Sequence, residues 1–303
     1  MEKLLKNFIA RIDAEALPIE GIAVMAEGKL AAEHRWTQDI PRNIYSHTKS
    51  FMSTAVGIAI SEGKLSLDDK LAEFFPEAVP QDASPLLFES ALRHLLTMSS
   101  GFDRSLLMGA DRRLGVGAPD YIRYMLSQPV LAKPGDHFHY STADSILAGR
   151  MLEKAIGMGM AEFLWERIFR PMDIGYPMWE FCPQGHAIGG GGMCLGLRDM
   201  MKLGQLYLDG GKWNGEQLVD PAWVKAATTK QIDTPKNDNV WHCGYGYQFW
   251  MSPYPDAYRA DGAHGQITTV LPEKGMVVSI QCPENGKFPQ VQAALHEEFL
   301  SLL

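Results

Sequence analysis

The sequence has few cysteines and no pair of them at metal-binding or redox spacing. Its four cysteines, at positions 182, 194, 243 and 282, lie far apart and include no C-x-x-C pattern. Isolated cysteines of this kind are typical of buried, reduced thiols in a cytoplasmic protein. The sequence therefore predicts neither a disulfide framework nor a metal site.

Long hydrophobic runs and clusters of basic residues are also missing. No segment approaches the roughly eighteen apolar residues that a membrane-spanning helix needs. In the first 17 residues, Arg11, Asp13 and Glu15 interrupt the apolar positions, so this stretch predicts an amphipathic helix rather than a signal peptide. A net charge of -8 without clustered Lys and Arg argues against nucleic acid as a partner. We expect a cytoplasmic protein without a membrane span, and the sequence leaves the oligomeric state open.

Several common catalytic motifs are absent as well. The chain has no G-x-S-x-G and no H-E-x-x-H, and Lys49-Ser50 is not preceded by the glycines of a phosphate-binding loop. The glycine run at 189–192 does not supply G-x-G-x-x-G, and it predicts a flexible loop. These absences argue against an α/β-hydrolase, a zinc protease and a nucleotide-binding site.

Strand-like segments occur near both ends of the chain, with mostly helical patterns between them. The expected strands are a hairpin over 21–36 with its turn at 27–29, and segments at 244–251, 265–271 and 275–282. Helices are expected at 1–17 and 288–303, after Ser46, over 139–157 and after the glycine run, with shorter or interrupted helical segments at 66–77, 90–101 and 106–134. This distribution predicts an α+β fold in which residues 1–62 and 240–303 form a sheet domain. Residues 63–239 are then a mostly helical domain, with a cleft between the two.

The stretch "YSHTKSF" places Ser46 three residues before Lys49, at the start of an apolar helix. Residues at this spacing share one helix face, with Cβ atoms about 5–6 Å apart. A serine is a weak nucleophile until a base takes its proton, and a lysine is a useful base only when burial or a nearby positive charge lowers its pKa. The helix that follows is apolar almost all round, which predicts burial. The alternative is a capping serine and a solvated lysine in the first helical turn.

A longer series of motifs resembles a known superfamily. The segments are 46–77, 92–101, 139–149, 189–219, 244–250 and 262–280, in that order. Together they resemble the serine β-lactamase and penicillin-binding superfamily, in particular its class C-like branch of esterases, D-aminopeptidases and 6-aminohexanoate-oligomer hydrolases. The resemblance covers the chain from about residue 20 onward. It implies a β-lactamase/DD-peptidase-like fold, with an antiparallel sheet flanked by terminal helices and a large, mostly helical inserted domain.

The resemblance also assigns roles to individual residues. It makes Ser46 the acylated nucleophile, Lys49 its base, and Tyr140 of "YST" the residue that shuttles protons. Two positions depart from the family. Thr142 replaces an asparagine that orients the substrate, and the last motif reads "GAHGQ" over 262–266.

Two residues of that last motif are candidates for the site. The backbone N–H of Ala263 is expected to join that of Ser46 in an oxyanion hole. His264 is either the polar group of the last active-site strand or a structural residue. The register remains open, because a one-residue slip exchanges the roles of Ala263 and His264.

The implied function is that of a serine hydrolase that needs no metal or organic cofactor. The lysine with which the family recognises a substrate carboxylate is missing from the last motif. Together with the expected cytoplasmic location, this favours an esterase or amidase on small-molecule esters or amides. The alternatives are a β-lactamase or D-Ala-D-Ala-type carboxypeptidase acting on a lactam or peptide, and a non-catalytic ligand-binding protein that kept the fold.

Overall fold

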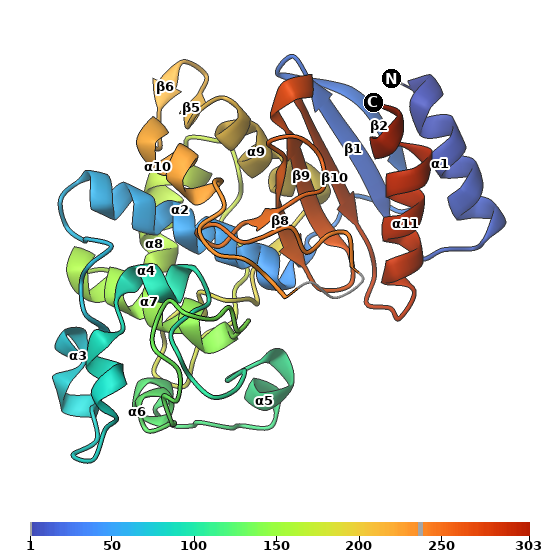
Figure 1. Cartoon of the computed structure of the whole chain (residues 1–303). Helices are drawn as coiled ribbons and strands as arrows, with labels where there is room; N and C mark the ends of the chain where they lie inside the picture. Colours follow the sequence, from blue (N-terminus) through green and yellow to red (C-terminus); the bar gives the residue numbers. More distant parts are fainter. Residues whose placement is uncertain (1, 236–238) are drawn as a thin grey trace.

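A six-stranded antiparallel sheet forms one side of the molecule (Figure 1). The structure is a computed structural model that describes residues 2–235 and 239–303. The strand order is β2-β1-β10-β9-β8-β7. The strands are β1 (Gly21–Ala26), β2 (Lys29–Arg35), β7 (Trp250–Met251), β8 (Tyr258–Gly262), β9 (Gln266–Leu271) and β10 (Met276–Gln281). Two short two-stranded pairs accompany it, β3 (Arg42–Asn43) with β4 (Cys194–Leu195) and β5 (Lys212–Trp213) with β6 (Glu216–Gln217).

The sheet is assembled from both ends of the chain, as the sequence predicts. The hairpin β1–β2 turns at Gly28, whose φ of 70° suits a residue without a Cβ, and β1 then pairs with β10. A strand was expected over 244–251, but the observed strand β7 contains only the last two of these residues. Strand β8 was not expected, because its segment "YRADG" is rich in charge and ends in glycine.

Three helices cover the two faces of the sheet (Figure 1). The terminal helices α1 (Glu2–Ala14) and α11 (Phe288–Glu298) pack side by side on one face, where Arg11 bonds to Glu297 at 2.6 Å. Helix α9 (Leu197–Leu208) packs on the other face. A Cβ on Gly204 would lie 2.6 Å from Thr268 Cγ2, so this glycine lets α9 approach β9 closely.

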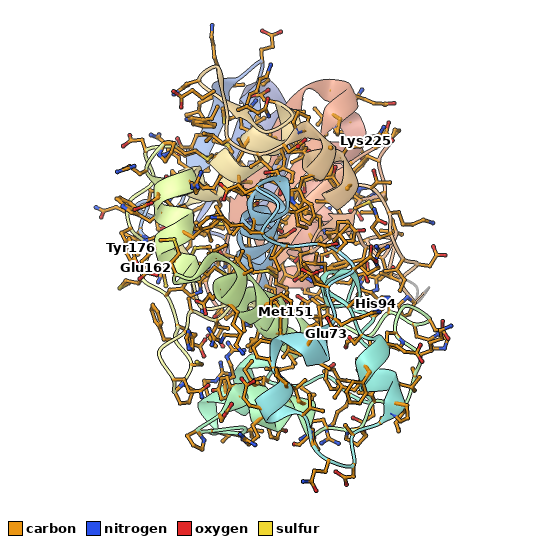
Figure 2. All side chains as sticks on the ribbon, turned by 90° about the vertical axis from the view of Figure 1, so that its left-hand side faces the viewer. Glu73, His94, Met151, Glu162, Tyr176 and Lys225 are labelled. Atoms are coloured by element: carbon orange, nitrogen blue, oxygen red, sulfur yellow. The ribbon has the colours of Figure 1, made fainter. Side chains whose placement is uncertain are left out.

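Helix α2 (Thr48–Ser61) is the centre of the helical part of the molecule. Twelve of its 14 residues are buried, which confirms the predicted burial of this helix. In Figure 2 it lies in the middle of the view, with Met151 of α7 below it and Lys225 of α10 above it. The other helices are α3 (Leu71–Phe74), α4 (Leu92–Leu96), α5 (Gly109–Arg113), α6 (Tyr121–Leu126), α7 (Thr142–Ile156), α8 (Met160–Leu164) and α10 (Pro221–Ala227). Over the described ranges, none of these helices is both long and apolar enough to cross a membrane.

Gln248 connects three helices to the segment that leads into β7. Its amide group donates to the carbonyls of Leu95 and Leu96 at 3.2 and 2.9 Å and accepts from Ser145 Oγ at 2.7 Å. Its own carbonyl accepts from Ser50 Oγ at 2.8 Å. The residue is buried and has a φ of 65°, so this network holds a backbone conformation that non-glycine residues rarely adopt.

We expect Gln248→Ala to destabilise the fold by roughly 2–4 kcal/mol. Truncation removes three hydrogen bonds, each worth about 0.5–1.5 kcal/mol, and leaves the buried Ser145 hydroxyl without its acceptor. The carbonyls of Leu95 and Leu96 keep the backbone N–H groups of Met98 and Gln248 as donors. Urea unfolding measures the change. Exposed Gln184→Ala is the matched control, and an unfolding free energy equal to that of the control would contradict a structural role for the amide.

Candidate active site

Ser46 lies in a tight 3₁₀ turn, Tyr45–His47, immediately before α2. Tyr45 has a φ of 47°, and its N–H donates to Asn43 Oδ1 at 2.8 Å. Buried His47 fixes the turn to the sheet, since its Nε2 lies 3.0 Å from Thr268 Oγ1. The capping role considered for Ser46 is wrong, because His47 is the N-cap residue of α2 and no side chain caps this end.

Lys49 is buried beside Ser46, with only 1% of its surface exposed. Its Nζ donates to the carbonyl of Gly190 at 2.6 Å and to Ser46 Oγ at 3.2 Å. Hydroxyl and amine are therefore within hydrogen-bonding reach, as the spacing predicts, and the solvated lysine of the alternative is wrong. Burial and the positive charge of Arg112 lower the pKa of Lys49 to about 7, while Asp144 acts in the opposite direction. A substantial fraction of this amine is neutral at pH 7.

The glycine run 189–192 forms the wall behind Lys49. A Cβ on Gly190 would lie 2.7 Å from Thr142 Cγ2 and 3.1 Å from Lys49 Nζ. Gly189 to Gly191 are buried, so the expected flexible loop is in fact packed against the site. The glycines let the backbone come close enough for its carbonyl to bind the amine.

Tyr140 lies between Lys49 and Trp250. Its ring centroid is 5.1 Å from Lys49 Nζ, and the ring stacks on Trp250 at 5.7 Å and 25°. Burial raises the pKa of Tyr140 and the carboxylate of Asp261 adds to the rise, whereas Ser46, a hydrogen-bond partner of the phenol, lowers it. The phenol is therefore neutral at pH 7, which suits a group that passes a proton on.

The end of β8 lies against the turn that carries Ser46. A Cβ on Gly262 would lie 2.1 Å from the carbonyl oxygen of Ile44, so the strand reaches the turn of Ser46 only because residue 262 is glycine. Ala263 follows and lines the same pocket as Ser46. Among the described residues, neither the N–H of Ser46 nor that of Ala263 donates to another protein group. Both donors are free for a substrate oxygen.

The remaining predicted residues, Thr142 and His264, also line this pocket. Thr142 begins α7, but its hydroxyl donates to Met108 Sδ at 3.3 Å rather than to Lys49. The placement of His264 on the last strand is wrong, because β8 ends at Gly262 and His264 lies in the following turn with a φ of 63°. Its Nδ1 is 3.0 Å from the carbonyl of Asn285 and its ring packs edge-on to Tyr45.

Two charged residues of the site carry no sequence motif and were missed. Arg112 of α5 acts on Lys49 and is held by Glu180 through two contacts of 2.8 Å. Asp144 of α7 is fully buried, accepts from Ser100 Oγ at 2.7 Å, and has a pKa that burial raises to about 7. Only the fold brings these side chains to Lys49, so sequence spacing could not reveal them.

We expect Asp144→Asn to extend activity to lower pH. Because the carboxylate raises the pKa of Lys49, its removal keeps the amine neutral at more acidic pH. The pH dependence of kcat/KM on a chromogenic ester measures the shift of the acid limb. Ser100→Ala is the companion variant. It removes the hydrogen bond that favours the ionised Asp144. The acid limb of the pH profile of Ser100→Ala should therefore also shift to lower pH, by a smaller amount. An acid limb that stays in place in Asp144→Asn contradicts the coupling.

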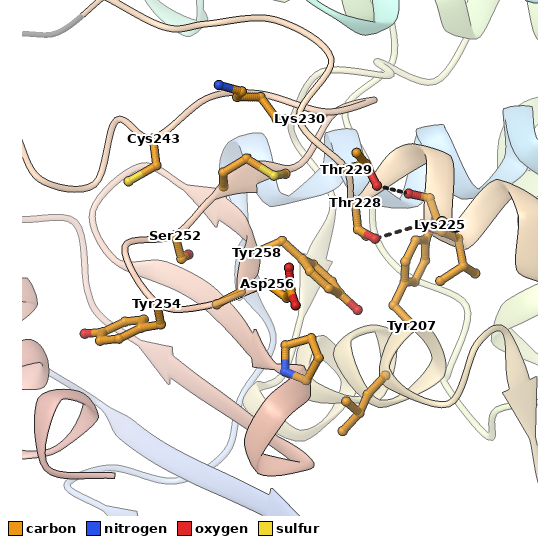
Figure 3. Close-up of a pocket in the computed structure, with 15 residues that line it drawn as sticks. Tyr207, Lys225, Thr228, Thr229, Lys230, Cys243, Ser252, Tyr254, Asp256 and Tyr258 are labelled. Atoms are coloured by element: carbon orange, nitrogen blue, oxygen red, sulfur yellow. Dashed lines mark hydrogen bonds between the residues drawn. The ribbon is translucent and has the colours of Figure 1, made fainter.

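The pocket in front of Ser46 has a volume of about 380 Å³. A larger pocket of about 490 Å³ lies between α9, α10 and β7–β8 (Figure 3). The hydroxyls of Thr228 and Thr229 in this pocket already donate hydrogen bonds, to the backbone carbonyls of Val224 and Lys225. Within the two described ranges, no group of three or more His, Cys, Asp and Glu side chains is placed to hold a metal ion.

The sequence matches one known protein family over almost its whole length. The profile of the family "Beta-lactamase" matches residues 8–300. The chain belongs to the beta-lactamase family. This confirms the resemblance seen in the motifs, and the architecture agrees with it. The structure of the octameric penicillin-binding protein homologue from Pyrococcus abyssi superposes with a TM-score of 0.77, covering 98% of this chain and 79% of that one at 20% identity.

Relatives within the family have diverse activities. Esterase EstB of Burkholderia gladioli is 29% identical over 152 residues, which cover 45% of this chain and 38% of that protein. The 6-aminohexanoate-dimer hydrolase of Paenarthrobacter ureafaciens is 24% identical over 228 residues, which cover 69% of this chain and 55% of that protein. The chain thus matches between about a third and just over half of the length of these relatives.

Proposed function

We propose that this beta-lactamase-family hydrolase forms an acyl-enzyme at Ser46 and acts as an esterase or amidase on small-molecule carboxylic esters or amides. The observation that carries the proposal is the buried Lys49, whose Nζ lies 3.2 Å from Ser46 Oγ and whose pKa is lowered to about 7. A neutral amine in contact with a serine hydroxyl is the arrangement that activates a serine nucleophile.

In the first step Ser46 Oγ attacks the carbonyl carbon and its proton passes to Lys49 Nζ. The oxygen that becomes negative lies between the backbone N–H groups of Ser46 and Ala263. The bond to the leaving group then breaks, and the leaving group takes a proton from Tyr140, which regains one from Lys49. Water then attacks the carbonyl carbon of the Ser46 ester and gives a proton to Tyr140 or Lys49. The bond to Ser46 Oγ breaks, Oγ regains its proton from Lys49, and the carboxylic acid is released. No cofactor is part of this scheme.

The last residues of β8 favour esters and amides over β-lactams and D-alanyl peptides. Ala260, Asp261 and Gly262 end the strand beside Ser46, and none of them is a cation. Asp261 bonds to Arg259 at 2.8 Å through one oxygen, and its charge acts on Tyr140. Asp261 is thus paired with the one cation of the strand, so a substrate carboxylate next to the leaving group finds no free lysine or arginine on β8.

A panel of substrates tests the proposal directly. The purified protein is assayed with 4-nitrophenyl esters, D-amino acid amides, linear amides and chromogenic lactams. We expect turnover of esters or amides above that of lactams. Preferred hydrolysis of lactams or D-alanyl peptides would support the alternative. No turnover of any class, with thermal stabilisation by one of the compounds, would favour a binding protein.

A further inference from the structure

The pocket in front of Ser46 contains charged residues of both signs on its wall. They are Arg112 and Arg113 of α5, Glu180, and Glu284, which follows β10. Which of these charges a substrate meets depends on the partners that each one already has. An ion pair closed within the protein has little charge left to offer to a ligand.

Arg112 and Glu180 are paired with each other. The Nε and the second terminal nitrogen of Arg112 each donate to one oxygen of Glu180 at 2.8 Å. The third nitrogen donates to the carbonyl of Leu107 at 2.7 Å, and the arginine side chain is only 8% exposed. This pair forms a fixed part of the wall.

Glu284 is partly engaged and mostly in water. One of its oxygens accepts from the phenol of Tyr45 at 3.2 Å, and the other lies 3.9 Å from His264 Nε2. Its side chain is 72% exposed, so solvent and salt screen its charge.

Arg113 is exposed at the end of α5 and lines the pocket together with Ser46. Over residues 2–235 and 239–303 it takes part in no ion pair and donates no hydrogen bond to another residue. Burial and Glu284 raise the pKa of the Tyr45 phenol next to Ser46, and the charge of Arg113 partly opposes this rise. A guanidinium without a partner presents a planar set of donors that fits a carboxylate.

The position of the pocket decides which part of the substrate Arg113 meets. Tyr140, which protonates the leaving group in the proposed mechanism, is not one of the pocket residues, whereas Ser46 and Ala263 are. The leaving group therefore departs on the Tyr140 side, and the acyl chain extends into the pocket towards α5.

We propose that Arg113 binds a carboxylate at the far end of the acyl chain, so that the preferred substrates are monoesters or monoamides of dicarboxylic acids. This inference rests on the proposed function and adds the class of acyl group. It is compatible with Asp261, because that carboxylate bonds to Arg259 at 2.8 Å and is not one of the residues that line the pocket.

Two esters with acyl chains of equal length test this specificity. Mono-4-nitrophenyl glutarate and 4-nitrophenyl pentanoate both carry five carbons, and only the glutarate ends in a carboxylate. After subtraction of spontaneous hydrolysis, we expect wild-type kcat/KM to favour the glutarate. Arg113→Gln should lower the glutarate-to-pentanoate ratio by about two- to fivefold, the contribution of an exposed ion pair. Arg113→Lys should retain part of the preference, and added salt should weaken it in the wild type and in Arg113→Lys but not in Arg113→Gln.

Matched variants separate this effect from a general change in charge. Arg123→Gln, an exposed arginine of α6, should leave the ratio unchanged, and Glu284→Gln should raise it by removing the opposing charge. A wild-type ratio near one, or equal losses on both esters in Arg113→Gln, would overturn the assignment while leaving an active esterase. If the protein hydrolyses neither ester and a fluorophosphonate does not label Ser46, the proposed function itself is overturned.

Discussion

Ser46→Ala is expected to lower kcat for the best ester or amide by a factor on the order of 10⁴ or more. Without Oγ no acyl-enzyme forms, and only binding and the oxyanion donors remain to assist water. The fold should survive. Ser46 is only partly buried, and its side chain caps no helix and bonds only to other site residues.

The matched control for this variant is Ser61→Ala at the other end of the same helix. Ser61 Oγ donates to the carbonyl of Ile58 at 2.8 Å, so the control also removes one hydroxyl and one hydrogen bond from α2. Kinetics and thermal unfolding are measured on both proteins. Full activity in Ser61→Ala with loss in Ser46→Ala supports the mechanism, whereas activity that persists in Ser46→Ala contradicts it.

Lys49→Met is expected to lower kcat by roughly 10²- to 10⁴-fold, the usual contribution of a general base. Methionine keeps the unbranched stem in its buried site but cannot take a proton from Ser46. Lys49→Arg should also be inactive, since a guanidinium stays charged at every accessible pH. Thermal unfolding shows whether either variant is folded.

The wild-type pH profile tests the same residue in a second way. Because the pKa of Lys49 is lowered to about 7, the amine is protonated below that pH and neutral above it. Activity should therefore rise as the pH increases through about 7. With an ordinary lysine as the base, this rise would occur near pH 10. A profile without a limb near neutrality, or the same limb retained in Lys49→Met, would assign the base to another group.

Sequence reasoning located the parts of the fold that local patterns specify. The hairpin β1–β2 follows from an apolar run, the turn at 27–29 and the partner strand after it. The burial of α2 follows from an apolar surface with no polar face. The proximity of Ser46 and Lys49 follows from helix geometry, because the turn over 45–47 leads directly into α2. Each of these features depends on residues that are close in the sequence.

Other features depend on contacts between distant segments. Strand β8 looked like a loop because Arg259 and Asp261 are charged, yet they neutralise each other at 2.8 Å and Arg259 packs over the ring of Trp250. Trp250 in turn supports Tyr140 from more than a hundred residues away. The run at 189–192 suggested flexibility, whereas its glycines serve close packing. The partners that constrain these segments were not identifiable from the sequence.

Trapping the acyl-enzyme is the most direct test of catalysis at Ser46. The protein is incubated with a fluorophosphonate or with its best ester, quenched in acid, digested, and the peptides are mapped by mass spectrometry. The mechanism predicts a single adduct on Ser46, formed more slowly in Lys49→Met and absent from Ser46→Ala. An adduct on a different residue, or turnover of the ester by a protein whose Ser46 is never modified, would contradict it.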